Sequence, residues 1–425
     1  MGILSVKDLR TDMVLAEDLK DGNGRLLIRQ GAVLTEQDLK ICKIWGIVEA
    51  DIAGVSSEEV EASAWKAYDA AAVAATAEAV RRRFCCNDMA HPAIRELVRL
   101  CTLRTAEGKG DVPVDAPTSA GLAEDCGASP KPPPLDLRPA DFIDKNTHLS
   151  TLPAIYRQII EAISKPSSSV YDIENVINKD TNLAARLLAL VNSAFFNYPS
   201  RIDTVSRAVN IIGTKQLSTL AIGVNIISMF KNIPPGLVNM KLFWEHSVLC
   251  GVCAGILAGY KHLPNTERMF LAGLLHDIGR LMFYNRFPAE SARTIVTARR
   301  NCTLLYLEER DTFGMDHSAV GRELLKNWKM PLSLEEMVHY HHEPQKAADR
   351  MEASILHLAD LMANAMAAGT SGERLVPPLS PEAWTQIDLS PNVLSLTMEL
   401  ADRQLDEVFE MLYGEKGASN KSATG

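Results

Sequence analysis

The stretch from Ala106 to Pro139 constrains this chain most, because it cannot form part of a folded core. It is rich in Gly, Pro, Ser and Asp, and it includes one lysine followed by three prolines at residues 131–134. Such a composition buries too little apolar surface to offset the conformational entropy that folding removes. We therefore predict a flexible linker over residues 106–140, with a folded unit on either side.

The length of the chain agrees with this division. At 425 residues it exceeds what one hydrophobic core normally serves. Its hydrophobic fraction of 47% and charged fraction of 23% lie near the average for globular proteins, so most of the chain should bury a core. We expect disorder only locally, in the linker and in a tail over residues 413–425.

Residues 1–53 are predicted to form a small α/β module. Short apolar runs at residues 14–16 and 26–28 flank the Asp-Gly and Asn-Gly steps at residues 21–24. Two apolar runs separated by such steps are a hairpin signal. Thr35 is a candidate N-cap and Gly46 a candidate stop for one helix, and a last strand should follow over residues 48–52.

From Ser56 the composition changes to alanine and charged residues. Residues 56–59, Ser-Ser-Glu-Glu, have the spacing of a capping box, and the chain stays helix-prone to about Leu103. We predict a helical spacer over residues 56–105. The arginine run at residues 81–83 could bind an anion, although a solvated helix face is the favoured interpretation.

After Phe142 the apolar pattern is helical almost to the end of the chain. Leu183, Leu187 and Val191, for example, share one helical face, and no strand alternation is visible in this part. The sequence therefore predicts a mainly α protein, with an all-α domain over residues 141–412 that follows the small module and the spacer.

Charge and cysteine usage exclude some classes of protein. The formal net charge of -9 disfavours generic nucleic-acid binding, which usually needs a basic face. Eight scattered cysteines do not make a disulfide framework, which favours reduced thiols. Cys250 and Cys253 lie in an apolar helical pattern without a second pair, so core packing is favoured over a zinc site. No long apolar run indicates a signal peptide or a membrane span, and we expect a cytoplasmic protein.

The segment from Gly273 to Gly279, Gly-Leu-Leu-His-Asp-Ile-Gly, is the most informative about function. Its central pair, His276 and Asp277, ends an apolar helix, and Gly279 is placed to terminate that helix. An imidazole and a carboxylate side by side can reach one cation, and burial would make an unpaired Asp277 costly.

Further histidines and one aspartate occur in similarly apolar settings. Ser333 and Glu336 form a candidate capping box, from which Leu334, Met337, Val338, His341 and His342 should share one buried face while His339 points away. A lone histidine is more often a satisfied core residue, but the ordered set favours a shared metal. The candidate ligands are His246, His276, Asp277, His317, His341, His342 and Asp360.

In this order the motifs resemble the HD superfamily of metal-dependent phosphohydrolases, and specifically the HD-related output domain, HDOD. The likeness covers roughly residues 142–365. It rests on Leu152-Pro153, Ala194-Phe195-Phe196, Ile212-Gly213, the segment 272–279, the segment 316–321 and His341-His342-Glu343-Pro344.

The resemblance implies a bacterial signal-transduction protein with an all-α HD-type domain and a divalent metal ion, with Fe, Mn, Mg and Zn all open. Residues 1–53 are similar to a module that precedes HD-GYP phosphodiesterase domains, through the segments 24–27 and 31–35.

Three departures from the catalytic relatives bear on activity. Residues 342–345 are not followed by the Gly-Tyr-Pro segment of cyclic di-GMP phosphodiesterases. Arg280 stands where those relatives usually have lysine, and an arginine can still hold a phosphate through its fork. Leu242 stands where some relatives place a metal-binding glutamate.

Two functions therefore compete. The favoured one is an output domain that binds a signalling protein or a small ligand, with nucleotides among the candidates, and performs no chemistry. The other is a metal-dependent phosphohydrolase in which the seven candidate ligands hold one or two ions, with Asp277 and Arg280 as candidate catalytic residues. A pH or redox sensor is a third, less supported alternative.

Overall fold

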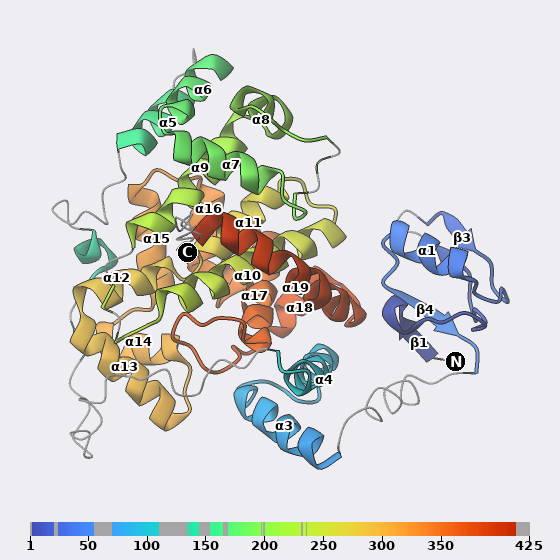
Figure 1. Ribbon diagram of the computed structural model, residues 1–425. Coiled ribbons are helices and arrows are strands. Elements are labelled where there is room, and N and C mark those ends of the chain that lie inside the picture. The colour runs from blue at the N-terminus through green and yellow to red at the C-terminus, as the bar shows by residue number, and fades with distance from the viewer. Residues whose placement is uncertain are drawn as a thin grey trace, which may run out of the picture. The chain divides into compact units, whose positions relative to one another are not determined.

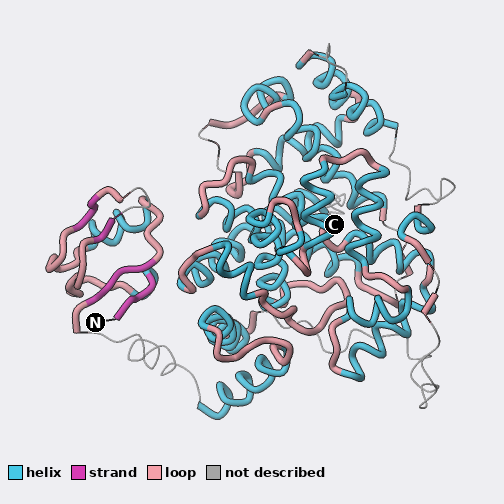
Figure 2. Tube along the Cα trace, turned by 180° about the vertical axis from the view of Figure 1, so that it is seen from behind, coloured by secondary structure: helices cyan, strands magenta, loops and turns pink. Residues whose placement is uncertain are grey.

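The computed structural model describes residues 2–20, 24–54, 70–109, 134–135, 137–143, 154–164, 169–196, 198, 200–230, 233–234 and 236–413 (Figure 1). The chain divides into two compact units: residues 1–109 with 388–400, and residues 110–387 with 401–425. The described residues confirm a mainly helical protein with a few short strands (Figure 2). The predicted capping box at residues 56–59, most of the predicted linker, Leu152-Pro153 and the tail from residue 414 lie outside the described residues.

Two small antiparallel ladders build the N-terminal module. β1 (Gly2–Ser5) pairs with β4 (Glu49–Ile52), and β2 (Leu19–Lys20) pairs with β3 (Leu26–Ile28). The predicted hairpin is confirmed, but its first strand lies at Leu19–Lys20. Residues 14 and 15 instead make isolated bridges to residues 33 and 52. A short 3-10 turn, η1 (Val6–Asp8), follows β1, a strand that the sequence analysis did not predict.

The single helix of this module is α1 (Glu36–Ile44), and its predicted ends are confirmed. Thr35 and Asp38 cap it reciprocally: the Thr35 backbone N–H donates to the Asp38 carboxylate at 2.9 Å, and the Asp38 N–H donates to Thr35 Oγ1 at 3.3 Å. Gly46, with φ of +64°, ends the turn after the helix. The helix packs over a core that contains Leu15, Leu34 and Ile52.

The described part of the predicted helical spacer forms two helices. α3 (Ala70–Arg83) ends before a turn, and α4 (Pro92–Ala106) starts a new helix packed against it. Pro92 has no backbone N–H to donate, which makes it a poor interior residue and a good first residue. The His91 side chain caps α4 by accepting from the Ala93 N–H.

The larger unit is all helical in its described part, as the periodicity predicts. Residues before its first long helices already belong to it: Phe142 lies at the end of the 3-10 turn η2 (Pro139–Phe142) and packs edge-on against Phe283, 5.1 Å between ring centroids. The helices that follow are α5 (Ala154–Ser164), α6 (Val170–Asn178), α7 (Thr181–Val191), α8 (Val205–Ile212), α9 (Thr214–Met229), α10 (Met240–Tyr260), α11 (Thr266–Leu275), α12 (Ile278–Arg286), α13 (Pro288–Asn301), α14 (Leu305–Phe313), α15 (His317–Asn327), α16 (Leu332–Tyr340), the 3-10 turn η3 (Pro344–Lys346), α17 (Arg350–Met366), α18 (Pro381–Ile387) and α19 (Asn392–Tyr413). Residues 392–400 of α19 belong to the smaller unit.

Helix α10 is the core helix around which the site is built, and it packs against α11 and α17. Its crossing with α11 is very close: a Cβ added to Gly273 would lie 2.4 Å from the Gly251 Cα, so only glycine fits there. Among the described residues α10 is long and apolar enough to cross a membrane, yet 78% of its apolar window is buried in this unit. Core packing therefore accounts for its apolar sequence.

Candidate metal centre

Three of the predicted ligands meet where α10 passes the junction of α11 and α12. His246 comes from α10, His276 follows the last residue of α11, and Asp277 precedes the first residue of α12. The Nε2 atoms of His246 and His276 lie 3.3 Å apart, and His276 Nε2 lies 3.3 Å from Asp277 Oδ2. We call these three residues the first group, and all of them are buried.

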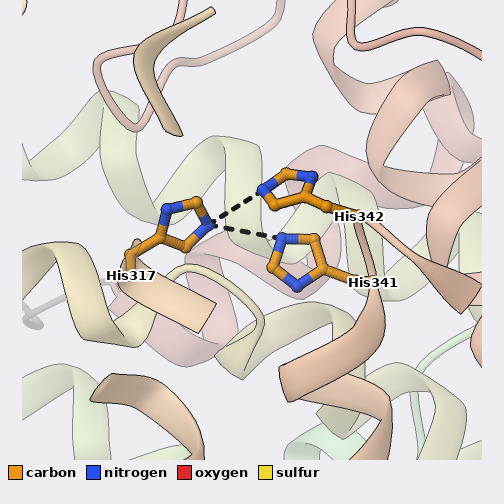
Figure 3. Close-up of side chains that lie close together, drawn as sticks. All are labelled: His317, His341 and His342. Atoms are coloured by element: carbon orange, nitrogen blue, oxygen red, sulfur yellow. Dashed lines mark hydrogen bonds between the residues drawn. The ribbon is translucent and has the colours of Figure 1, made fainter. Parts of the chain in front are cut away.

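A second group consists of His317, His341 and His342 (Figure 3). His317 is the first residue of α15, and the two other histidines directly follow α16. The Nε2 atom of His317 lies 3.3 Å from that of His341 and 3.2 Å from that of His342. All three rings therefore direct the same nitrogen to a common point.

Asp277 links the two groups through its two oxygens. Oδ1 lies 2.9 Å from His317 Nε2 in the second group, whereas Oδ2 lies 3.3 Å from His276 Nε2 in the first. Asp360 from α17 adds a second carboxylate to the first group, with its Oδ1 3.2 Å from His276 Nε2 and 3.4 Å from His246 Nε2. The structure thus brings all seven predicted residues together, while their role as ligands stays a prediction.

The ring orientations are set by bonds to the far nitrogens. Nδ1 of His276 donates to the Gly273 carbonyl and Nδ1 of His341 to the Val338 carbonyl, both at 2.7 Å. His317 Nδ1 lies 2.6 Å from Glu309 Oε2 on α14. When Nδ1 carries the proton, a neutral ring presents a lone pair at Nε2, so these bonds direct lone pairs to the centre.

This arrangement fits a metal ion on chemical grounds. Buried Nε2 lone pairs that face one another at 3.2–3.3 Å repel unless a proton or a cation lies between them. Imidazole nitrogens with carboxylate oxygens suit zinc, iron or manganese. His246 Nδ1 is buried with no hydrogen-bond partner among the described residues, so no such bond fixes the tautomer of this ring.

Residues 149–344, which contain six of the seven candidate ligands, match the HDOD domain family. This segment is an HDOD domain. Asp360 lies beyond the matched residues, and so does the N-terminal module, whose likeness to the module ahead of HD-GYP domains stays a prediction.

Known proteins resemble the chain over this HDOD domain and its surroundings. The structure of an HDOD domain protein with unknown function from Geobacter sulfurreducens is 20% identical, with a TM-score of 0.53, and covers 65% of this chain and 97% of that chain. A protein provisionally named a phosphohydrolase, from Shewanella amazonensis SB2B, is 24% identical, with a TM-score of 0.49, over 64% of this chain and 97% of that chain. An uncharacterized protein of Treponema pallidum (strain Nichols) is 26% identical over 224 residues, which are 52% of this chain but 42% of that protein. The Geobacter sulfurreducens structure supports the HDOD fold. The matched part of this chain spans less than half the length of the Treponema pallidum protein.

Arg280 lies behind the centre of the HDOD domain rather than at its surface. Its Nη1 donates to Asp277 Oδ2 at 2.9 Å and its Nε to Glu309 Oε1 at 3.0 Å, and Nη1 also donates to Ser371 Oγ. With 2% of its surface exposed, this guanidinium positions Asp277 and Glu309. The predicted phosphate-binding role of Arg280 has no contact to support it in this arrangement.

The protonation of the site follows from burial and from these charges. Burial would raise the pKa of Asp277, but the charges of Arg280 and His276 outweigh it and hold that pKa well below its ordinary value. Burial and the neighbouring His276 lower the pKa of His341 to about 3, so this ring stays neutral. Burial and Arg280 lower the pKa of His317, yet Glu309 and Asp277 prevail and raise it to about 9.

Glu309 is the functional residue that sequence reasoning missed. It is buried, accepts from the His317 backbone N–H at 2.9 Å and also contacts the His317 ring and Arg280. The sequence carried no signal for it, because residues 308–311, Glu-Glu-Arg-Asp, are a run of charged residues that is typical of a solvated helix face.

Two local predictions in the HDOD domain are wrong. Gly279 does not terminate a helix: it is the second residue of α12, where a Cβ would lie 1.9 Å from the His317 carbonyl oxygen, so its role is close packing of α12 on α15. Ser333 does not cap α16, which already begins at Leu332 after Pro331 and has no side-chain cap. Glu336 instead accepts from Arg322 at 3.5 Å.

His339 and His357 are two further histidines of this region, and neither belongs to the two groups. His339 is half-buried and belongs to neither group, as its helical position predicted. His357 on α17 is buried, but both of its nitrogens are used: Nδ1 donates to the His341 carbonyl at 2.7 Å, and Nε2 accepts from the Ser380 N–H at 3.0 Å. It supports the backbone at His341 and has no lone pair left for an ion.

Proposed function

We propose that this chain is a bacterial, cytoplasmic signal-transduction protein whose HDOD domain binds divalent metal and presents the metal-loaded domain to a partner protein or a small ligand. One observation carries the proposal: the two carboxylate oxygens of Asp277 face different groups. Oδ1 lies 2.9 Å from His317 Nε2, and Oδ2 lies 3.3 Å from His276 Nε2. A carboxylate in this position can bridge two ions, each with imidazole ligands of its own.

Burial supports binding over catalysis. The rings of His246, His276, His317 and His341 are fully buried, and Asp277 and Asp360 are 2% and 4% exposed. An ion held by these residues would connect helices α10, α12, α15 and α17. The guanidinium of Arg280, which could otherwise hold a phosphate, contacts Asp277, Glu309 and Ser371.

A metal-dependent phosphohydrolase is the second candidate, and His342 is the observation that favours it. This residue is the half-exposed member of the second group, and its ring stacks on the half-exposed Tyr306 at 4.1 Å between centroids. A metal ion held beside His342 would polarise a phosphoryl oxygen of the substrate and lower the pKa of a bound water. Substrate would have to approach from the side of Tyr306.

Elemental analysis combined with a turnover assay separates the two functions. The full chain is purified without added metal and also after loading with Mn²⁺, Fe²⁺ or Zn²⁺. Metal content is then measured beside hydrolysis of bis(p-nitrophenyl) phosphate and of cyclic dinucleotides. We expect bound metal without turnover. Bound metal with turnover that Asp277→Asn abolishes would establish the phosphohydrolase, and wild-type protein that takes up no metal would overturn both functions.

His339→Ala is the matched control for this experiment. His339 lies on α16 next to the second group but outside it, and its ring is half-buried. Metal content should be the same in this variant as in the wild type. A loss of metal from His339→Ala equal to that from Asp277→Asn would show that general damage to α16, rather than ligand removal, controls metal content.

A further inference from the structure

Two adjacent cysteines lie in the turn between α3 and α4, in the unit that does not contain the metal centre. Cys85 is exposed and Cys86 half-buried. Their Sγ atoms are 3.8 Å apart, so both thiols point to the same side of the turn. The other described cysteines are buried, apart from Cys302, which is exposed.

The backbone of the turn holds the two thiols together. Asn87 donates its N–H to the Phe84 carbonyl at 2.9 Å, which places Cys85 and Cys86 at the two central positions of a hydrogen-bonded turn. Phe84 is fully buried and anchors the start of this turn, and Pro92 begins α4 shortly after it. The sulfur atoms are therefore near neighbours because of the fold, and not only because of their adjacency in sequence.

We propose that Cys85 and Cys86 are a reversible redox site, which a hydroperoxide oxidises to a disulfide between the adjacent residues. The more exposed thiol, Cys85, attacks the peroxide as thiolate: an S–O bond forms, the O–O bond breaks, and water or an alcohol leaves. Cys86 then attacks the Cys85 sulfur, so that the S–S bond forms, the S–O bond breaks and a second water leaves. Two thiols lose two electrons and two protons, and the peroxide is reduced.

The geometry also makes the bond easy to reduce again. A disulfide needs its sulfurs about 2.05 Å apart and normally joins Cα atoms about 4.4–6.8 Å apart. Adjacent Cα atoms across a trans peptide are separated by only about 3.8 Å, so the closed ring is strained. Strained and exposed disulfides are the labile, regulatory ones. Formation of the disulfide changes the shape of the turn that connects α3 to α4. We therefore expect it to change how these two helices pack.

The test uses the full chain, hydrogen peroxide and a thiol label. Trypsin cleaves after Arg83 and Arg95, which releases one peptide, residues 84–95, with both cysteines and no others. After peroxide treatment this peptide should lose two hydrogens in mass and resist alkylation by N-ethylmaleimide. Dithiothreitol or reduced glutathione should restore both labels. A peptide that keeps two alkylatable thiols, or that appears cross-linked between two chains, overturns the proposal.

Three variants make the result specific. In Cys85→Ser and Cys86→Ser the two-hydrogen loss should disappear, because the remaining thiol has no adjacent partner. Cys302→Ser removes another exposed thiol and should leave the oxidation of peptide 84–95 unchanged. If peroxide instead linked peptide 84–95 of the wild type to the peptide that contains Cys302, the disulfide would join Cys302 to one of the pair and the inference would be wrong.

Discussion

Asp277 and Arg280, one helical turn apart at the start of α12, form a buried ion pair with 2.9 Å between Oδ2 and Nη1. The same Oδ2 lies 3.3 Å from His276 Nε2, so the guanidinium and the centre share one carboxylate oxygen. Arg280 keeps Asp277 ionised and oriented, and Asp277 in turn satisfies a buried positive charge. Metal binding and stability of the apo fold are therefore joined at this residue.

Asp277→Asn should remove metal from both groups, because the NH2 that replaces one oxygen cannot ligate a cation and the oxygen that remains no longer carries a negative charge. The variant should also lower the free energy of unfolding of the metal-free protein by about 1–3 kcal/mol, since Arg280 loses a charged hydrogen-bond partner but keeps Glu309. Metal stoichiometry and urea denaturation with chelator measure the two effects. Unchanged stoichiometry would contradict the assignment of Asp277 as a ligand.

Glu309→Gln tests the orientation of His317. The amide can still accept or donate near Nδ1, but the negative charge that holds this ring is lost. Metal affinity should fall about 10–100-fold, the usual effect of removing a partner behind a ligand. Titration with Zn²⁺ against a competing chelator measures it. Glu336→Gln, which removes a partly buried carboxylate bonded to Arg322, is the control and should bind metal normally.

Gly279→Ala should separate α12 from α15. The new Cβ would lie 1.9 Å from the His317 carbonyl oxygen and 2.8 Å from the Gly321 nitrogen, both backbone atoms that cannot move alone. We expect a loss of about 1–3 kcal/mol or more in the free energy of unfolding, together with weaker metal binding at the second group. Gly259→Ala is the matched control in α10, where a Cβ meets nothing within 4 Å, and it should stabilise by about 0.5–1 kcal/mol. Equal effects of the two substitutions would rule out the close approach at Gly279.

Asp316 should make the free energy of unfolding of the helical unit depend on pH in the acid range. It caps α15 by accepting from the Ser318 N–H at 3.0 Å and pairs with Arg310 at 2.6 Å. Burial would raise the pKa of this carboxyl, but His317, the Ser318 bond and Arg310 lower it to about 2. Because the folded pKa lies below the unfolded value of about 3.9, the stabilisation, about 2–3 kcal/mol, is complete above about pH 5 and is lost as the pH falls through about 2.

The variant for this prediction is Asp316→Asn, which keeps a capping side chain and removes the charge. Its deficit relative to the wild type in urea denaturation should be largest near neutral pH and should shrink toward pH 2. A deficit that stayed constant over this range would mean that the charge of Asp316 contributes nothing and that shape alone matters.

The sequence predicted the structure well where a pattern has a single physical explanation. The helical periodicity predicted the helical unit, and burial of polar residues in apolar helices led to His276, Asp277 and Asp360. Glu309 was missed because its purpose depends on α14 lying against α15, a tertiary contact that periodicity does not encode. The glycine at 279 was misread for the same reason: termination and close packing both select glycine, and only the neighbouring chain distinguishes them. Ser333 has capping chemistry, but Pro331 starts the helix before it.

The burial of the centre affects the rate of metal exchange rather than the affinity for metal. Six of the seven candidate ligands are at most 4% exposed, and His342 with Tyr306 lies at the half-exposed side. An ion that leaves must wait for the helices to loosen or for this stacked pair to move. Exchange with solution should therefore be slow compared with binding to a surface site. The ion carried by a given molecule would then record which metals were abundant when that molecule folded, long after the surroundings had changed.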